Sequence, residues 1–274
     1  MDSLKILFKS LAVYSRLDLL WLLRDTKYCI LQIVADVVSS SSVIIGILLL
    51  SIKFDGLSGM SHSQVILMIS ISSNVHGIYN LFFANYNNGI ISRIIGRGQI
   101  EHYIIQPVPI WIQVVTRGFA PFSGNSQFII SICLMIYALK LLNIFSIIML
   151  LKLVFISIFS TIIMVSYIYM ISSLAFYSPS VCEEISQLVL NLFVSTSYFP
   201  LGKFKFMYII LYSFVLPVGS IAWFPMKAIF NVNYCAIYIL FAFIILIMSS
   251  VFFRKGLDYY AKKGACRYSG FGHR

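Results

Sequence analysis

Few side chains of this sequence are placed to carry out chemistry, and the first of them is an acid in unusual surroundings. Asp36 is the one acidic residue well inside a long apolar stretch. If that stretch crosses a membrane, an ionisable group at such depth indicates a function by default. One interpretation places Asp36 in a translocation path. The other is a structural pairing with Ser39, Ser40 or a neighbouring helix.

Polar side chains also mark one side of the next apolar stretch. His76 and Asn80 lie four residues apart and therefore share a helical face, with Asn74 close by. Hydrogen bonding between helices explains such residues, and the alternative is contact with a ligand or a proton relay. A lone histidine does not indicate a metal, and the five cysteines include no C-x-x-C pair, so no metal site is predicted.

Known catalytic motifs are absent from the sequence. It contains no G-x-x-x-x-G-K-[ST] phosphate-binding loop, no H-E-x-x-H and no G-x-S-x-G. The short run from Gly96 to Gly98 lacks the lysine that a phosphate-binding loop needs. We therefore predict no catalytic residue in this chain and no cofactor bound by it.

A charged segment between two apolar stretches has two distinct faces. Within residues 88–107, Arg93, Arg97 and Glu101 follow one another at four-residue spacing, which predicts a pair between Arg97 and Glu101. The apolar face of the same segment consists of Ile90, Ile91, Ile94 and Ile95. The segment is either an interfacial connector or a docking element for a cytoplasmic partner.

Glycine and proline interrupt this segment, and two acids lie further along the chain. The glycines at positions 96 and 98 weaken a continuous helix, and Pro107 and Pro109 end it before the next apolar stretch. Glu183 and Glu184 begin the fifth apolar stretch. They are predicted either to stabilise a helix N-terminus or to contact a basic groove of a partner.

The composition shows where these residues must lie. Of the 274 residues, 60% are hydrophobic and only 11% are charged, with a mean hydropathy of +0.93. A soluble domain needs about a quarter charged residues, so the outside of this chain must face lipid. The net charge of +11 is not read as a nucleic-acid footprint, because its placement along the chain fits a membrane topology.

The sequence predicts an all-α integral membrane protein with six transmembrane helices and no further domain. They are expected at residues 28–52, 64–84, 119–139, 151–176, 185–199 and 234–253. Residues 1–27 precede them and show an amphipathic pattern, which predicts an interfacial helix on the cytoplasmic surface of the membrane. Its apolar face consists of Leu4, Leu7, Phe8, Leu11 and Tyr14.

Residues 204–227 are apolar enough to form a seventh crossing, but Pro217, Gly219 and Pro225 interrupt them. A seventh crossing would place the basic tail, residues 254–274, outside, which the positive-inside rule disfavours. We therefore predict a re-entrant hairpin at the outer side, with both termini and the coupling segment 85–110 in the cytoplasm. Irregular backbone at membrane depth must then be covered by protein.

Three runs carry a family resemblance: RIIGRGQIEHYIIQPVP, YFPLGKF followed by VLPVGSIAWFP, and FFRKGLDYYAKKGACR. In their order and spacing they resemble ABC-2-type permeases of uncharacterised ATP-binding-cassette export systems. The first run matches the family pattern of Gly, a spacer, Leu/Ile-x-x-Tyr, two aliphatic residues, x and Pro. The tail departs from the family, since Ala-Lys-Lys-Gly-Ala-Cys stands where a Ser/Gly-rich turn is expected.

The resemblance implies a membrane subunit that is moved by separate ATPase chains. Two permease chains, identical or sister subunits, bind two cytoplasmic ATPase subunits, which hold ATP and Mg. The exported molecule is an amphipathic peptide, a lipid or a drug-like compound, and the location is the bacterial plasma membrane. The residues expected to couple to the ATPase are Arg93, Arg97, Glu101, Tyr103, Pro107, Glu183 and Glu184.

Other functions remain open alternatives. An ion-coupled secondary transporter usually shows two matching halves with broken helices, and residues 1–137 do not repeat in 138–274. A membrane enzyme needs a cluster of His, Asp or Glu near one leaflet, which the pattern does not show. A non-transporting sensor or immunity protein is distinguished from the first function by whether an ATPase co-purifies with the chain.

Overall fold

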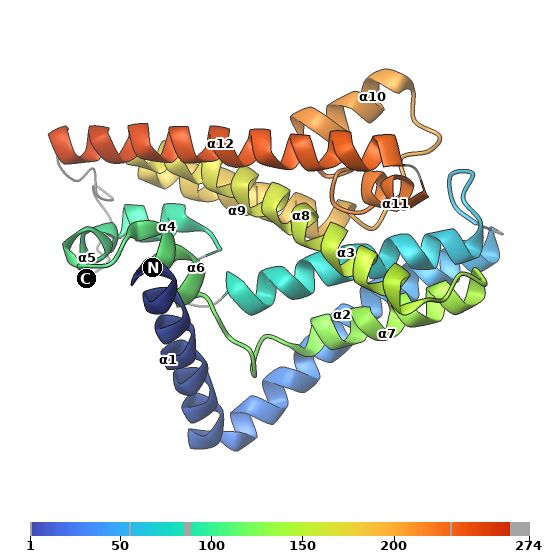
Figure 1. Ribbon diagram of the computed structural model, residues 1–274, viewed down its shortest axis with the longest axis horizontal. Helices are drawn as coiled ribbons and strands as arrows, with labels where there is room; N and C mark the ends of the chain where they lie inside the picture. Colours follow the sequence, from blue (N-terminus) through green and yellow to red (C-terminus); the bar gives the residue numbers. More distant parts are fainter. Residues whose placement is uncertain (1, 55, 85–88, 231, 264–274) are drawn as a thin grey trace.

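The computed structural model describes residues 2–54, 56–84, 89–230 and 232–263, and within these ranges the chain is helical with no strand (Figure 1). The predicted tail beyond residue 263 and residues 85–88 of the predicted coupling segment lie outside the described residues.

Within these described ranges, six long helices run between two ends of the molecule. They are α2 (Thr26–Lys53), α3 (His62–Phe82), α7 (Ser126–Leu141), α8 (Ile147–Ser172), α9 (Pro179–Thr196) and α12 (Val232–Lys263). Four described segments are long and apolar enough to cross a membrane, and they coincide with the first, second, fourth and sixth predicted spans. These are Thr26–Lys53, His62–Phe82, Ile147–Phe176 and Tyr234–Lys263.

Helix α7 differs from the third predicted span at its start. That span was expected from residue 119, but the helix begins at Ser126 and has 16 residues. Residues 119–125 form turns instead, because Pro121 and Gly124 favour turns.

Helix α9 and helix α12 each extend beyond the predicted span. Helix α9 begins at Pro179, six residues before the predicted start, because proline is favoured in the first turn of a helix. Helix α12 continues through Arg254 to Lys263. The predicted span ended at residue 253 because Arg254 and Lys255 follow it. Arginine and lysine are good helix formers, so the helix continues beyond its apolar part.

Short elements gather at the two ends of the long helices. Three of them, α4 (Ile91–Gly96), α5 (Ile100–Ile105) and α6 (Ile110–Arg117), lie at the end where α12 finishes, which we call the α4–α6 end (Figure 1). At the opposite end, called the α10–α11 end, lie α10 (Phe206–Ile210), the π-helical turn Leu211–Val215 and α11 (Trp223–Phe230).

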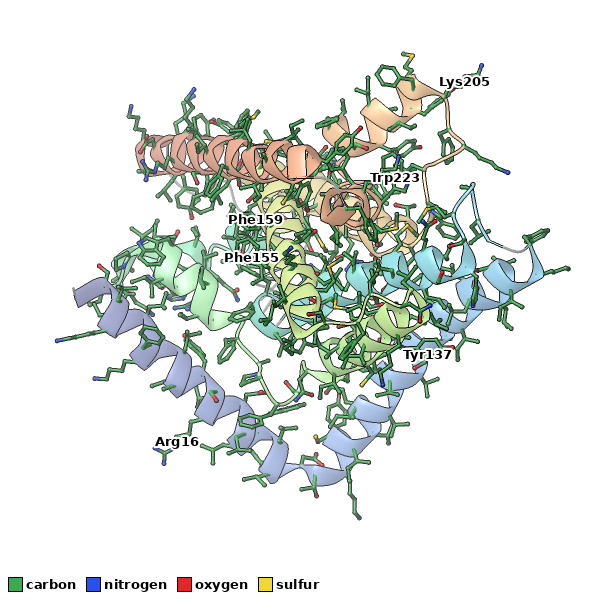
Figure 2. All side chains as sticks on the ribbon, turned by 45° about the vertical axis from the view of Figure 1, so that its right-hand side comes forward. Arg16, Tyr137, Phe155, Phe159, Lys205 and Trp223 are labelled. Carbon is green, nitrogen blue, oxygen red and sulfur yellow. The ribbon has the colours of Figure 1, made fainter. Side chains whose placement is uncertain are left out.

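Helix α3 is the centre of the bundle. Its side chains from Val65 to Gly77 are buried, whereas most side chains of α2 are exposed. The start of α3 is defined by a capping box, in which Ser61 and Gln64 each satisfy the other's backbone N–H. Helix α12 packs on α8 through aromatic contacts such as Phe159 with Phe243, whose ring centroids are 6.1 Å apart. Figure 2 shows Phe155 and Phe159 next to each other on α8.

Helix α1 (Asp2–Arg24) leaves the α4–α6 end at a steep angle to the long helices (Figure 1). The predicted apolar face of α1 is exposed in its first part and half-buried further along. Leu4 and Phe8 are exposed, at 60% and 67%, while Leu11 and Tyr14 are half-buried. Arg16 points away from the bundle in Figure 2. An exposed apolar stripe beside basic residues is what a helix on a membrane surface presents.

A buried carboxylate fixes α1 to the bundle. Asp18 is 8% exposed and accepts hydrogen bonds from Phe122 N at 2.8 Å, from Ser123 N at 3.2 Å and from Ser123 Oγ at 2.6 Å. Hydrogen bonds to a charged acceptor are among the stronger ones in proteins. Asp18 therefore ties the N-terminal helix to the turn that precedes α7, a role that the sequence pattern did not indicate.

Candidate functional site

The apolar face of the charged segment forms a core at the α4–α6 end. The predicted isoleucine face of α4 is buried, and its burial joins α4 and α5 to the ends of α8, α9 and α12. The core consists of Ile91, Ile94, Ile95, Ile100, Tyr103, Ala175, Phe176, Cys182 and Tyr260. A change in the position of α4 therefore acts directly on three long helices.

An ion pair joins α4 to α9. Arg93 Nε lies 2.9 Å from Glu183 Oε1, and Arg93 Nη2 donates to Gln187 Oε1 at 3.2 Å. Because α9 begins at Pro179, Glu183 lies beyond the first turn, which contains no acid. The predicted stabilisation of the helix N-terminus is therefore wrong for both acids, since that effect is confined to the first turn. Glu184 is exposed.

The predicted pair between Arg97 and Glu101 does not form. Arg97 is exposed and makes no ion pair with any described residue. Gly98 has a φ of +70°, which ends α4 and turns the chain before α5, so the four-residue spacing is not that of one continuous helix. Glu101 instead accepts a hydrogen bond from Tyr260 Oη at 3.1 Å, which links α5 to α12.

Tyr103 is enclosed at the junction of α5 and α6. Its side chain is 2% exposed, and the Arg117 guanidinium lies 3.9 Å from the ring centroid. Burial raises the pKa of the Tyr103 phenol, while Arg117 opposes that shift. Gln113 Nε2 donates to the carbonyl oxygens of Tyr103 and Val108, each at 2.8 Å, and so holds the exposed turn at Pro107.

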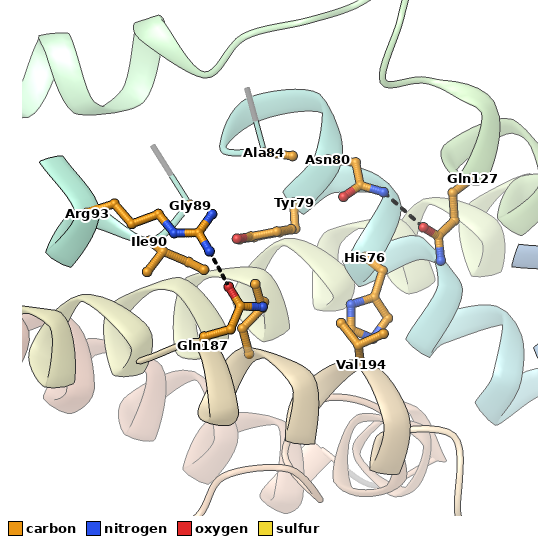
Figure 3. A pocket seen from close by; sticks show the side chains of 11 residues that line it. His76, Tyr79, Asn80, Ala84, Gly89, Ile90, Arg93, Gln127, Gln187 and Val194 are labelled. Atoms are coloured by element: carbon orange, nitrogen blue, oxygen red, sulfur yellow. Dashed lines mark hydrogen bonds between the residues drawn. The ribbon is translucent and has the colours of Figure 1, made fainter. Parts of the chain in front are cut away.

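A cleft of about 370 Å³ opens between α3, α7, α9 and the start of α4 (Figure 3). It brings together two of the predicted path residues, His76 and Asn80, with Arg93 of the predicted coupling set. Two glutamines that the sequence pattern did not single out also line it, Gln127 and Gln187. Its other lining residues are Tyr79, Ala84, Gly89, Ile90, Leu190 and Val194.

Hydrogen bonds connect α3 to its neighbours beside this cleft. Asn80 Nδ2 donates to Gln127 Oε1 at 3.0 Å, and Gln127 Nε2 donates to Tyr198 Oη at 3.2 Å. His76 Nε2 lies 3.0 Å from Ser197 Oγ. The hydrogen bonding between helices that was expected of His76 and Asn80 is therefore present.

The other two predicted path residues lie elsewhere. Asn74 is fully buried and donates from Nδ2 to Ser131 Oγ of α7 at 2.8 Å, away from the cleft lining. Asp36 lies on α2, and its carboxylate has no hydrogen-bond partner among the described residues. The side-chain pairing expected between Asp36 and Ser39 is not formed. Ser39 Oγ instead donates to the backbone oxygen of Asp36, at 3.1 Å.

The proline-punctuated segment is covered by protein. Pro217, Gly219 and Pro225 are buried, and the turn that joins the π-helical turn to α11 packs against long helices. Tyr238 Oη of α12 donates to the backbone oxygen of Ser220 at 2.8 Å. Backbone groups that leave a helix within the apolar region need such partners.

Two residues that line the cleft, Gln127 and Gln187, were not predicted from the sequence. Gln187 lies four residues after Glu183, so the shared helical face was a visible signal. Gln127 lies in the first turn of α7, where no periodic pattern of polar residues marks it. Among the described residues, no group of three His, Cys, Asp or Glu lies close enough to hold a metal ion.

Comparison with known proteins adds one finding. A family model described as ABC-2 family transporter protein matches residues 37–264, which include every helix from α3 to α12 and most of α2. No curated protein and no solved structure matches the chain.

Proposed function

Because this chain belongs to the ABC-2 family of transporter proteins, we propose that it is the permease of an ATP-driven exporter, powered by an ATPase on separate subunits. The observation that carries the proposal is the construction of the α4–α6 end, where a short two-faced segment is packed onto three long helices at once. The substrate is proposed to be an amphipathic peptide, a lipid or a drug-like molecule.

The solvent-exposed surface of the α4–α6 end has the composition of a docking surface. This end carries the exposed cation Arg97 and several exposed apolar side chains, of which Ile105 is the most exposed, at 78%. We call this the α5 surface, and it consists of Arg97, His102, Ile104, Ile105, Pro107 and Trp111. The sequence has no phosphate-binding loop, so ATP and Mg are proposed to bind the partner that covers this surface.

Two connections would carry movement from the α5 surface into the bundle. The first is the Arg93–Glu183 pair with the isoleucine core, which leads into α9. The second is the Glu101–Tyr260 hydrogen bond, which leads into α12. We propose that two ATPase copies act on two permease chains, identical or sister subunits, with α4 and α5 moved by ATPase closure.

The proposed topology has six crossings, α2, α3, α7, α8, α9 and α12, with the α4–α6 end in the cytoplasm of a bacterial cell. Helix α7 has 16 residues and spans only about 24 Å at roughly 1.5 Å per residue. The hydrocarbon core of a bilayer is about 30 Å thick, so the turns at both ends of α7 must complete the crossing. The position of α10 and α11 at the opposite end supports a re-entrant segment at 204–227 (Figure 1).

Single cysteines at Lys203 and Lys227 test this topology. Both residues are exposed, and Lys205 next to the first projects outward in Figure 2. We expect a membrane-impermeant maleimide to label both positions from outside intact cells, and to label Arg97→Cys only after permeabilisation. Labelling of 203 and 227 from opposite sides would show that the segment crosses.

Substitution on the α5 surface tests the proposed partnership. We expect Ile105→Glu to abolish co-purification of the ATPase in detergent, because a charge replaces the most exposed apolar side chain of the surface. Met207→Glu is the matched control, since Met207 is 81% exposed at the opposite end. Co-purification that survives Ile105→Glu would remove the docking role, and transport by the isolated chain in liposomes would contradict the proposed function.

A further inference from the structure

Three carboxamide side chains line the cleft, and the proposed coupling uses neither Asn80 nor Gln127. Asn80 comes from α3, Gln127 from α7 and Gln187 from α9, so three long helices contribute one each. We infer that the cleft binds an uncharged, amide-bearing group of the substrate, such as a short stretch of peptide backbone with an apolar side chain. This inference rests on the proposed function, because it names the chemical class of the transported molecule.

The charge of the cleft argues against an anionic ligand. Arg93 is the charged member among the described lining residues, and its Nε lies 2.9 Å from Glu183 Oε1. Because Glu183 already neutralises the Arg93 guanidinium and Gln187 accepts a further N–H from it, the cleft offers little net positive charge to attract a phosphate or carboxylate. A lipid phosphate or a peptide carboxylate is therefore a poorer occupant than a neutral polar group.

Unused hydrogen-bonding capacity is concentrated on one wall of the cleft. The amide nitrogen of Asn80 is bonded to Gln127, while no donor from the described residues reaches Asn80 Oδ1. His76 is 3% exposed, and its Nδ1 has no partner in the described part of the chain. Figure 3 shows both side chains at the cleft. Buried polar atoms are nearly always paired, and His76 Nδ1 is an exception that a ligand could satisfy. Asn80 is partly exposed at the cleft, so its Oδ1 is an acceptor open to a ligand.

The other walls of the cleft are apolar, which suits the apolar side chain of a peptide segment. Ile90, Leu190 and Val194 supply an apolar surface. An amide group carries both a donor and an acceptor, so it can satisfy carboxamide and imidazole atoms together. The volume of about 370 Å³ lies near the lower end of the roughly 300–1,000 Å³ of ligand pockets. The cleft therefore takes one segment of an extended peptide at a time.

Photolabelling of the permease–ATPase complex in detergent tests this inference. The probe is N-acetyl-photoleucine N-methylamide, an uncharged capped residue with a diazirine, and its matched analogue has esters in place of both amides. We expect the amide probe to label peptides that contain Leu190 or Val194, as read by mass spectrometry. The ester should label roughly fivefold less, because it has lost its hydrogen-bond donors.

Three variants test whether the labelling occurs in the cleft. We expect Gln127→Leu to lower labelling roughly fivefold by removing hydrogen bonds at the cleft. Val194→Phe should block labelling by filling the cleft without removing a hydrogen bond, since Val194 is 46% exposed and tolerates a larger side chain. Gln32→Leu, which changes a carboxamide of α2 outside the cleft, should leave labelling unchanged.

Several results would overturn the inference while leaving the proposed function intact. They are equal labelling by amide and ester, unchanged labelling in both cleft variants, and stronger labelling by the free-acid form of the probe than by the amide. In each case the ATPase would still co-purify. Loss of ATPase association from the unmodified chain would instead contradict the proposed function, on which the inference rests.

Discussion

Gly77→Ala should destabilise the protein more than any other single methyl addition on α3. A Cβ at Gly77 would lie 2.6 Å from Phe128 Cα and 2.7 Å from Phe128 N, so the added methyl meets backbone rather than a movable side chain. Helix α3 and helix α7 would have to move apart, which disrupts the packing between these two helices. We expect a loss of about 1–3 kcal/mol, as for overpacked cores.

Thermal unfolding in detergent measures this effect, and the chain offers a matched control. Gly46 is also a helical glycine in an apolar helix, but a Cβ there meets nothing within 4 Å. Gly46→Ala should therefore leave the unfolding temperature unchanged or raise it slightly, because alanine favours helix. Equal effects of the two substitutions would show that α3 and α7 do not approach as closely as described.

Arg93→Ala should uncouple the α5 surface from α9. The substitution leaves Glu183 without its charge partner in a site where the two side chains are 33% and 25% exposed, so the stability loss should be modest, about 1 kcal/mol. The functional loss should be larger, because the ion pair is the direct polar connection from α4 to α9. We expect ATP-dependent transport to fall roughly tenfold, while the ATPase still co-purifies.

The charge-reversed double variant separates the ion pair from a general effect of the substitution. Arg93→Glu with Glu183→Arg restores an opposite-charge pair, so transport should recover in part relative to either single change. Arg16→Ala is the control, since Arg16 projects away from the bundle (Figure 2). Full transport in Arg93→Ala would mean that movement passes to the bundle through the isoleucine core or Tyr260 alone.

Local sequence was enough to predict the faces of helices but not the partners of their polar atoms. The isoleucines of α4 recur at helical spacing, which predicted one apolar face, and the structure buries that face. Arg97 and Glu101 have a suitable spacing too, yet the turn at Gly98 separates them. Arg93 finds its partner 90 residues away, on a helix whose rotation the spacing within α4 cannot reveal.

The same limit applies to the predicted path residues. A polar residue in an apolar helix can be recognised from sequence, and Asp36, Asn74, His76 and Asn80 were recognised in this way. Which of them share a cavity depends on how helices pack, and only His76 and Asn80 do. The buried carboxylate of Asp18 lay in a segment interpreted only as a surface helix, because its acceptor role depends on a turn 104 residues away.

The sequence by itself determined that this is a membrane-embedded helical protein with a two-faced segment at one end and no phosphate-binding loop of its own. Those properties follow from composition, run length and helical period, which are all local. Only the tertiary structure decided that Arg93 joins Glu183, that Asp18 binds the turn before α7, and that carboxamides of three helices meet in one cleft. The physical reason is that hydrogen bonds and ion pairs act over a few ångströms between distant segments, and helix packing alone brings those segments together.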